Sequence, residues 1–160
     1  MSKAKTLAKG AAGAAAAVAI ALPVVMQWEG VSLRAYKDRL AYGIPTVCYG
    51  ETVGVDLNKT YTMQECAEML RARLPQYQAG IRSCLKRDIP ASVEAALIVF
   101  GYNIGTSGVC NSTALRKINA GDIRGGCDAF LMWTKAGGQF RQGLLNRRKA
   151  ERKLCLDGLK

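Results

Sequence analysis

The sequence contains no histidine, and its 12 acidic residues are outnumbered by 23 Lys and Arg. Without histidine, a histidine-dependent catalytic triad and a His-ligated metal site are both excluded. Acid/base chemistry therefore falls to carboxyl groups. The cysteines form no C-x-x-C pair, which argues against zinc binding and thioredoxin-like redox chemistry. The chain also has no internal repeat and no flexible interdomain linker, and its 160 residues suit one folded domain.

The excess of Lys and Arg over Asp and Glu gives a net charge of +11. Such a charge predicts an anionic partner, which could be nucleic acid, a membrane surface or an acidic wall polymer. A generic basic surface without a specific partner is the alternative. Disorder is not expected, because 49% of the residues are apolar.

Cysteine is abundant by comparison, with six residues spread evenly along the chain. An even, dispersed set favours three disulfides in an oxidising compartment, although it leaves the pairing open. Six buried, reduced thiols are the alternative. The cysteines are Cys48, Cys66, Cys84, Cys110, Cys127 and Cys155.

The N-terminus has the pattern of an exported protein, because lysines precede an uncharged apolar run at residues 10–26. The run is about as long as a minimal membrane span, but it is mostly Ala and Gly and contains Pro23. A cleaved signal peptide, a stable transmembrane helix, a marginal anchor that later leaves the bilayer, and a soluble Ala-rich helix are all compatible with it. We expect a weak membrane segment at residues 1–27 and a folded domain at residues 28–160.

The folded part begins with a predicted β-hairpin at residues 33–52 and continues with helices. A capping box from Thr62 to Glu65 opens one helix, and Pro75 is expected to end it or to begin a linker. A helix from Pro90 to Gly105 is apolar nearly all round and should be the central buried helix. Further helices are expected at residues 112–118, 123–134 and 143–156.

Two carboxylates frame the start of the folded part. Glu29 follows the apolar segment, and Asp38 lies nine positions later, before a strand-like run that begins at Thr46. Two carboxyl groups delivered to one cleft are what glycoside hydrolysis requires, because one donates a proton while the other activates water or stabilises charge. The spacing alone is a weak signal, since most Glu and Asp residues are solvated.

An ordered set of motifs makes the signal specific. Together with the Glu29–Thr52 stretch, these motifs resemble the phage lysozymes of glycoside hydrolase family 24 over roughly residues 28–158. The weak N-terminal segment resembles that of the signal-arrest-release endolysin subgroup. The resemblance implies an α+β, lysozyme-like fold, mostly helical with a small antiparallel hairpin in its N-terminal lobe. The later motifs are Phe100–Gly105, Ser112–Asp122, Trp133, Ala136–Gly138 and Gly143–Arg148.

The resemblance also implies catalytic roles. Glu29 matches the general acid, Asp38 the second carboxylate, and Thr46 the threonine that completes the site, while Arg147 matches an arginine that pairs with the glutamate. Trp28 and the apolar segment suit a protonated Glu29, and the cations beside Asp38 favour its carboxylate form. Thr46 comes eight residues after Asp38, farther than is usual in the family, which indicates an insertion of two residues at the hairpin tip.

Tyr102 and Asn103 match positions that line the saccharide cleft in the family. Aromatic faces pack on sugar rings, and amides bond N-acetyl groups. A core aromatic on the central helix is the alternative for Tyr102, and a solvated cation in a basic helix is the alternative for Arg147. The resemblance implies that the protein acts outside the cytoplasm, where disulfides persist. We expect each cysteine to pair with its neighbour in sequence, which gives the pairs Cys48–Cys66, Cys84–Cys110 and Cys127–Cys155.

The implied function is that of a muramidase needing neither cofactor nor metal. It cleaves peptidoglycan, is held inactive at the host inner membrane by residues 10–26, and is then released to the periplasm. A holin acts in the same lysis pathway without implied direct binding. We expect a monomer and no nucleic-acid partner. The alternatives are a lytic transglycosylase and a non-catalytic, basic wall-binding or membrane-anchored module.

Overall fold

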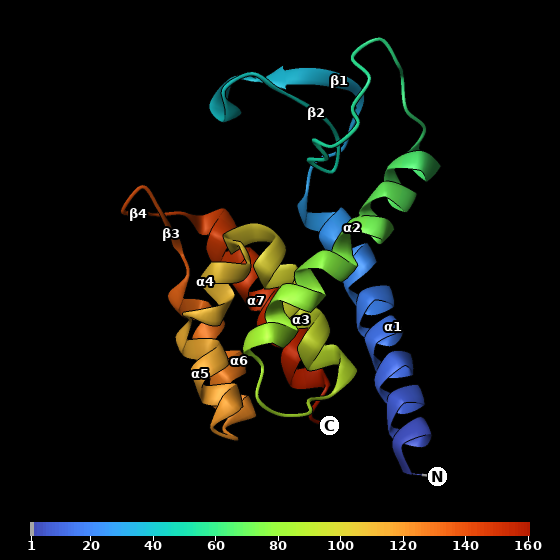
Figure 1. The fold of residues 1–160 in the computed structure, drawn as a ribbon. Coiled ribbons are helices and arrows are strands. Elements are labelled where there is room, and N and C mark those ends of the chain that lie inside the picture. Colours follow the sequence, from blue (N-terminus) through green and yellow to red (C-terminus); the bar gives the residue numbers. More distant parts are fainter. Residues whose placement is uncertain (1) are drawn as a thin grey trace.

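The computed structural model describes the backbone of residues 2–160 and the side chains of residue 10 and residues 12–160. It consists of a helical body with a small β-lobe at the top of Figure 1. The predicted fold class, mostly helical with a small antiparallel hairpin, is confirmed. The helices are α1 (Ser2–Trp28), α2 (Met63–Cys84), α3 (Ala91–Ile104), α4 (Thr106–Cys110), α5 (Thr113–Asn119), α6 (Ile123–Ala129) and α7 (Gln142–Asp157). The strands are β1 (Ser32–Asp38), β2 (Ile44–Cys48), β3 (Lys135–Ala136) and β4 (Gln139–Phe140), and the 3-10 helices are η1 (Arg39–Ala41) and η2 (Phe130–Met132).

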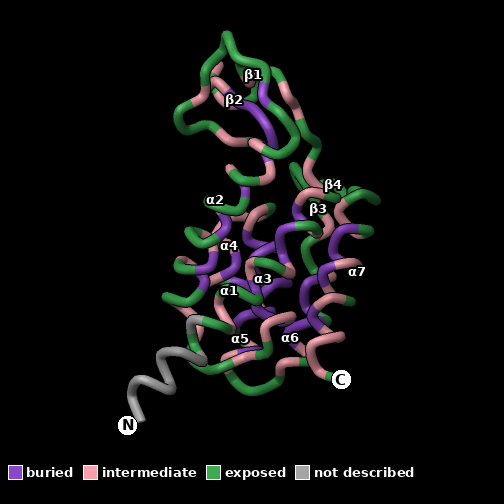
Figure 2. The backbone as a smooth tube through the Cα atoms, turned by 90° about the vertical axis from the view of Figure 1, so that its right-hand side faces the viewer, coloured by how far each residue is buried: buried purple, intermediate pink, exposed green. Residues whose placement is uncertain are grey.

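Helix α3 is the centre of the helical body because it is apolar on nearly every side. Every residue from Val93 to Gly101 is buried, and α1, α2 and α7 pack around it. The predicted end is confirmed, because Gly105 ends the helix with a φ of 84°. The helix begins at Ala91, one residue after the predicted first residue Pro90. In Figure 2 the buried residues concentrate in this body, whereas the β-lobe is largely exposed apart from β2.

Helix α1 lies along the body and contributes one face to the core. Ala17, Ala21, Leu22 and Val25 are buried, and their spacing of three and four residues places them on the same side of the helix. This side packs against α2 and α3. Within the described part of the chain, no helix combines the length and the apolar character that crossing a membrane requires.

Helix α2 begins where the sequence predicts but continues past the predicted stop. The Thr62 hydroxyl accepts a hydrogen bond from Glu65 N (3.1 Å), and the Glu65 carboxylate accepts one from Thr62 N (2.8 Å), which forms the predicted capping box. Pro75 lies inside α2 and does not end it. Proline removes one backbone hydrogen bond, but the buried Leu74 and Ile81 hold the helix against the body on both sides of that gap.

The chain after α5 differs from the single helix predicted for residues 123–134. Helix α6 ends at Ala129, and a single 3-10 turn leads to the small β3–β4 hairpin. Gly137 and Gly138 occupy its turn with φ values of 58° and 76°. Such positive values are what a two-residue hairpin turn needs. The two glycines therefore reverse the chain between strands and do not stop a helix.

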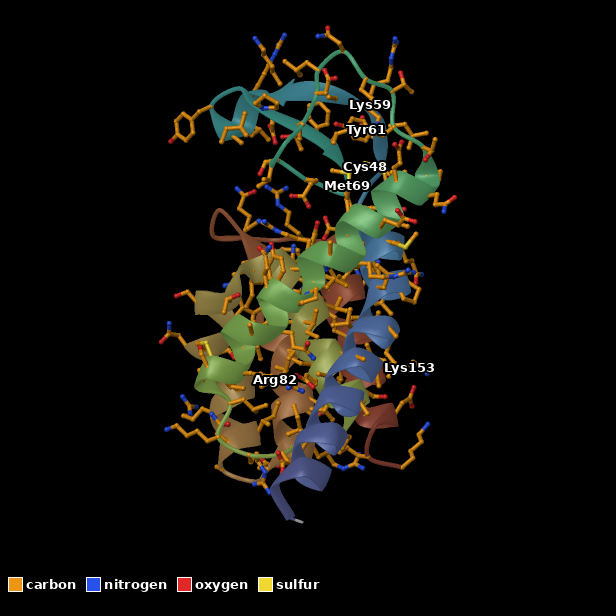
Figure 3. The ribbon with its side chains drawn as sticks, turned by 45° about the vertical axis from the view of Figure 1, so that its right-hand side comes forward. Cys48, Lys59, Tyr61, Met69, Arg82 and Lys153 are labelled. Carbon is orange, nitrogen blue, oxygen red and sulfur yellow. A yellow bond between two sulfur atoms is a disulfide. The ribbon has the colours of Figure 1, made fainter. Side chains whose placement is uncertain are left out.

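Three disulfides tie the elements of the body together, and they join the same pairs that sequence neighbourhood led us to expect. One joins β2 to the first turn of α2, one joins the end of α2 to α4, and one joins α6 to α7. Figure 3 shows Cys48 beside Met69 where the β-lobe meets α2, and their sulfur atoms lie 3.8 Å apart. The pairs are Cys48–Cys66, Cys84–Cys110 and Cys127–Cys155.

The close approach of α5 and α6 gives a test of the packing. A Cβ at Gly126 would lie 2.4 Å from Ile118 Cγ1 and 2.8 Å from the Ala114 carbonyl oxygen. We expect Gly126→Ala to lower the free energy of unfolding by about 1–3 kcal/mol, because a backbone atom blocks the added methyl group. Urea unfolding followed by circular dichroism measures this change.

Gly143→Ala in α7 is the matched control, since a Cβ there meets nothing within 4 Å. We expect it to be neutral or to stabilise the fold by up to about 1 kcal/mol, because alanine restricts the unfolded chain. Equal stabilities of the two variants would contradict the close α5–α6 contact.

Candidate active site

Glu29 lies at the junction between the helical body and the β-lobe. Its backbone N–H donates to the Val25 carbonyl (2.8 Å), so the residue continues the last turn of α1. Its carboxylate is 26% exposed and accepts a hydrogen bond from Arg147 Nη1 at 2.7 Å. The ion pair joins the end of α1 to α7, two elements 118 residues apart in sequence. The carboxylate is thus held in place with one side open to solvent.

Arg147 is the hub of a buried charge network. Its guanidinium also contacts Glu151 Oε1 (3.2 Å) and donates to the Val99 carbonyl of α3 (3.3 Å). Arg148 pairs with Glu151 Oε2 at 2.7 Å. Burial raises the pKa of Glu151, and the two neighbouring guanidiniums oppose that shift. Buried charges require such partners, because an unpaired charge away from water is strongly destabilising.

The roles of Arg148 and Glu151 were missed by sequence reasoning. A spacing of three or four residues between the arginines and Glu151 is the signal that could have found the network. In an arginine-rich helix, however, the same spacing is typical of solvated surface pairs. Only the fold shows that this face of α7 packs against α3.

Asp38 ends β1 and organises the hairpin tip. Its Oδ1 accepts a hydrogen bond from Leu40 N (2.9 Å), and its backbone carbonyl accepts one from Gly43 N (2.7 Å). The side chain is partly buried. One carboxylate oxygen is therefore engaged in the turn, while Oδ2 retains its capacity to accept a hydrogen bond from a ligand or water.

Thr46 lies on β2, facing Tyr36 in the β1–β2 register. It is buried, with 4% of its surface exposed, and its hydroxyl donates to the Ile44 carbonyl at 3.1 Å. A hydroxyl that donates one hydrogen bond still accepts others. Within the described residues, no hydrogen bond or ion pair joins Glu29, Asp38 and Thr46 to one another. The structure thus places Asp38 and Thr46 on one hairpin and Glu29 at its base.

Tyr102 connects α3 to the β-lobe. Its hydroxyl donates to the Tyr49 carbonyl, and its ring lies 5.1 Å from that of Tyr77. Burial, followed by the negative charge of Glu29, raises the pKa of Tyr102. Its hydroxyl proton is used by the Tyr49 carbonyl, so the ring faces and the acceptor side of the hydroxyl remain for the sugar contact that the sequence predicts.

Asn103 is the other predicted saccharide ligand, and it lies exposed beside Tyr102 on α3. Its Oδ1 accepts a hydrogen bond from Arg148 Nη2 at 2.8 Å. This bond orients the amide, so Nδ2 is left as the group that donates to a ligand. Asn103 thereby joins the charge network to the candidate site. Among the described residues, no group of three His, Cys, Asp or Glu side chains could hold a metal ion.

Comparisons with known proteins give a consistent result. Residues 26–151 match a family model described as phage lysozyme. The chain is 46% identical over 132 residues to the SAR-endolysin of Enterobacteria phage P21, covering 81% of this chain and 78% of that protein. A crystal structure of a P22 lysozyme mutant aligns with a TM-score of 0.77 and 33% identity, covering 85% of this chain and 94% of the other. The active form of the P1 phage endolysin has a TM-score of 0.73 at 22% identity, covering 88% and 84%, and shows the fold alone.

The hydrogen bond of Tyr102 predicts a specific pH dependence of stability. Tyr102→Phe should lower the free energy of unfolding by about 1 kcal/mol at neutral pH, because the Tyr49 carbonyl loses its donor. The raised pKa means that this contribution is complete below the ordinary tyrosine value of 10.0. It is lost as the pH rises above that value, since the unfolded chain deprotonates first.

Urea unfolding of both proteins from pH 7 to pH 11 measures the difference. Tyr36→Phe, which removes a partly exposed hydroxyl on β1, is the control. A wild-type advantage over Tyr102→Phe that stays constant across pH 10 would contradict the buried, neutral phenol.

Proposed function

Because the chain belongs to the phage lysozyme family, we propose that it hydrolyses the β-1,4 bond between N-acetylmuramic acid and N-acetylglucosamine in host peptidoglycan. Membership in the family makes it a lysozyme and an endolysin. The observation that carries the finer proposal is the 2.7 Å ion pair between Arg147 and Glu29. It fixes one partly exposed carboxylate where the helical body meets the hairpin that bears Asp38.

In the proposed mechanism, the helical body and the β-lobe supply residues with different roles. Glu29 donates a proton to the glycosidic oxygen as the bond breaks, so the leaving sugar departs as a neutral alcohol. Asp38 accepts a proton from a water molecule, which Thr46 helps to orient, and this water attacks the anomeric carbon. A water-mediated attack of this kind inverts the configuration at that carbon. Arg147 positions Glu29, and Asn103 and the ring of Tyr102 contact the saccharide.

A lytic transglycosylase remains the rival activity. It also needs one acid, but it forms an anhydro-muramic end without an attacking water. Analysis of the products from purified sacculi separates the two activities. Reducing ends support hydrolysis, whereas anhydro ends would overturn the assignment of Asp38 and Thr46 to a water molecule.

Substitution of the two carboxylates tests the mechanism. We expect Glu29→Gln and Asp38→Asn each to lower the rate of sacculus hydrolysis by about 10²–10⁴-fold, because each removes a proton-transfer group. Glu68→Gln, an isosteric change at an exposed position of α2, is the matched control and should retain full activity. A folded Glu29→Gln enzyme that lysed permeabilised cells at the wild-type rate would overturn the role of Glu29 as the proton donor. A wild-type protein that bound sacculi without releasing products would instead favour the wall-binding module.

We further propose that residues 10–26 tether the newly made enzyme to the host inner membrane, on its periplasmic face, before release to the periplasm. Two facts support this. The segment is apolar but rich in Ala and Gly, so it gains little by staying in lipid. In the structure the same segment supplies Ala17, Ala21, Leu22 and Val25 to the core. One helix cannot occupy both environments, so docking of α1 and membrane insertion exclude each other.

A polar contact strengthens the docked arrangement. Gln78 of α2 donates from Nε2 to the Ala14 carbonyl (3.0 Å) and to Glu94 Oε1 (3.1 Å). Arg82, labelled on α2 in Figure 3, donates to the same Glu94 carboxylate at 2.9 Å. The buried Gln78, which also bonds to Glu94, thus contacts the α1 backbone. Because Glu29 follows α1 directly, docking also brings the proposed general acid to Arg147.

A matched pair of alanines tests the two environments of α1. Ala17 is fully buried, whereas Ala16 is exposed. Leucine at either position strengthens membrane retention by a similar amount, so both variants should be released more slowly when the membrane potential is collapsed. After extraction, Ala16→Leu should be as active as wild type, whereas Ala17→Leu should be destabilised by about 1–3 kcal/mol through overpacking.

Fractionation with a lysis assay before and after collapse of the potential measures release, and urea unfolding of the extracted proteins measures the destabilisation. A chain that is already shortened at its N-terminus and active before the collapse would show an ordinary cleaved signal and overturn the tether. Equal stability of the two extracted variants would instead overturn the docked position of α1. The proposal also includes a monomeric enzyme that depends on a holin for timing without binding it.

A further inference from the structure

The tip of the first hairpin, residues 39–43, exposes two large apolar side chains. Tyr42 is 100% exposed and Leu40 is 97% exposed, the highest values among the large apolar residues of the described chain. In Figure 1 this tip is the end of the β-lobe that points away from α2, on the same side of the molecule as the β3–β4 hairpin. Within the described residues the Tyr42 side chain makes no hydrogen bond and no aromatic contact, so its ring is available to a ligand outside the chain.

Tyr42 also holds an unfavourable backbone conformation. Its φ is 57° and its ψ is 30°, in the left-handed region that bulky residues rarely adopt. Glycine or asparagine would occupy this position with less strain. A tyrosine kept here at a cost in stability indicates that its side chain is needed.

One residue, Asp38, links the hairpin tip to the proposed active site. Asp38 binds Leu40 N with its carboxylate and Gly43 N with its backbone carbonyl. These two hydrogen bonds close the turn on both sides of Tyr42. The backbone of Tyr42 is therefore held in a defined position relative to Asp38, so its side chain starts from the same turn as the proposed site.

The charges around the tip favour an anionic ligand. Lys37 and Arg39 flank Asp38, and Arg34 lies further along β1; all three are exposed. Asp38 is the only acid between residues 30 and 50. A peptidoglycan strand combines sugar rings, which offer apolar C–H faces, with carboxylates on its lactyl groups and stem peptides. An aromatic face between cations is complementary to both features.

We propose that Tyr42 stacks on a sugar ring of the glycan strand outside the sugars that flank the cleaved bond, and that Lys37 and Arg39 bind the carboxylates beside it. This inference rests on the proposed peptidoglycan substrate and adds a contact that matters only for long strands. Tyr42 acts in binding and takes no part in the proton transfers. Removal of the Tyr42 ring should therefore raise KM for sacculi and leave kcat unchanged.

Three substitutions at one position separate the ring from the backbone strain. Tyr42→Asn keeps a residue that accepts the left-handed conformation but removes the ring, Tyr42→Ala removes both, and Tyr42→Phe keeps the ring. We expect Tyr42→Asn and Tyr42→Ala to raise KM for purified sacculi by about fivefold at unchanged kcat, as suits one aromatic contact. Tyr42→Phe should match wild type. On a soluble tetrasaccharide fragment of the glycan, all three should match wild type.

Val53→Ala is the control, since Val53 is 68% exposed in the loop after β2 and belongs to no proposed contact. Wild-type KM values for Tyr42→Asn and Tyr42→Ala on sacculi would overturn the inference and leave the hydrolase intact. Reduced flotation of these variants with phosphatidylglycerol vesicles, at unchanged sacculus kinetics, would overturn it in favour of a membrane contact. Failure of the proposed function is separate, because it appears as wild-type hydrolysis by Glu29→Gln.

Discussion

The ion pair between Glu29 and Arg147 is the constraint on which the arrangement of the molecule depends. Arg147 and Arg148 are buried together on α7, and Glu151 supplies only one negative charge to the pair. Glu29 supplies the second, from the other end of the chain. Because an uncompensated buried cation is costly, the network favours the conformation in which the end of α1 lies against α7. Folding energy and the placement of the proposed acid thus come from the same contact.

The network also relates the two lobes. Arg147 donates to the Val99 carbonyl and Arg148 to Asn103, both on α3. Tyr102, between these two positions in sequence, reaches across to the Tyr49 carbonyl of the β-lobe. A single turn of α3 therefore contacts the charge network on one side and the hairpin on the other. This turn therefore links the β-lobe to the surroundings of Glu29.

The sequence predicts the local boundaries well, because they depend on a few neighbouring atoms. Thr62 with Glu65, and Pro90 with Gly105, begin or end helices by hydrogen bonds and dihedral preferences that any context allows. Pro75 was misjudged because burial on both sides outweighs one missing hydrogen bond. The candidate residues Glu29, Asp38 and Thr46 came from family resemblance, and their roles stay predictions. The strained Tyr42 could not have been foreseen, since its conformation opposes the residue's own preference.

Because of where the disulfides lie, their formation and the docking of α1 are two separate stages of maturation. All six cysteines lie in the chain after α1, so the covalent frame closes around the body whether or not α1 has docked. Disulfide formation is slow and depends on an oxidant, whereas docking of one helix is a first-order event within a single molecule. A tethered molecule whose disulfides have already formed would therefore need only the docking of α1 to become complete. Because α1 contains no cysteine, no disulfide restrains it on the proposed tether, and its docking on the body is the last step.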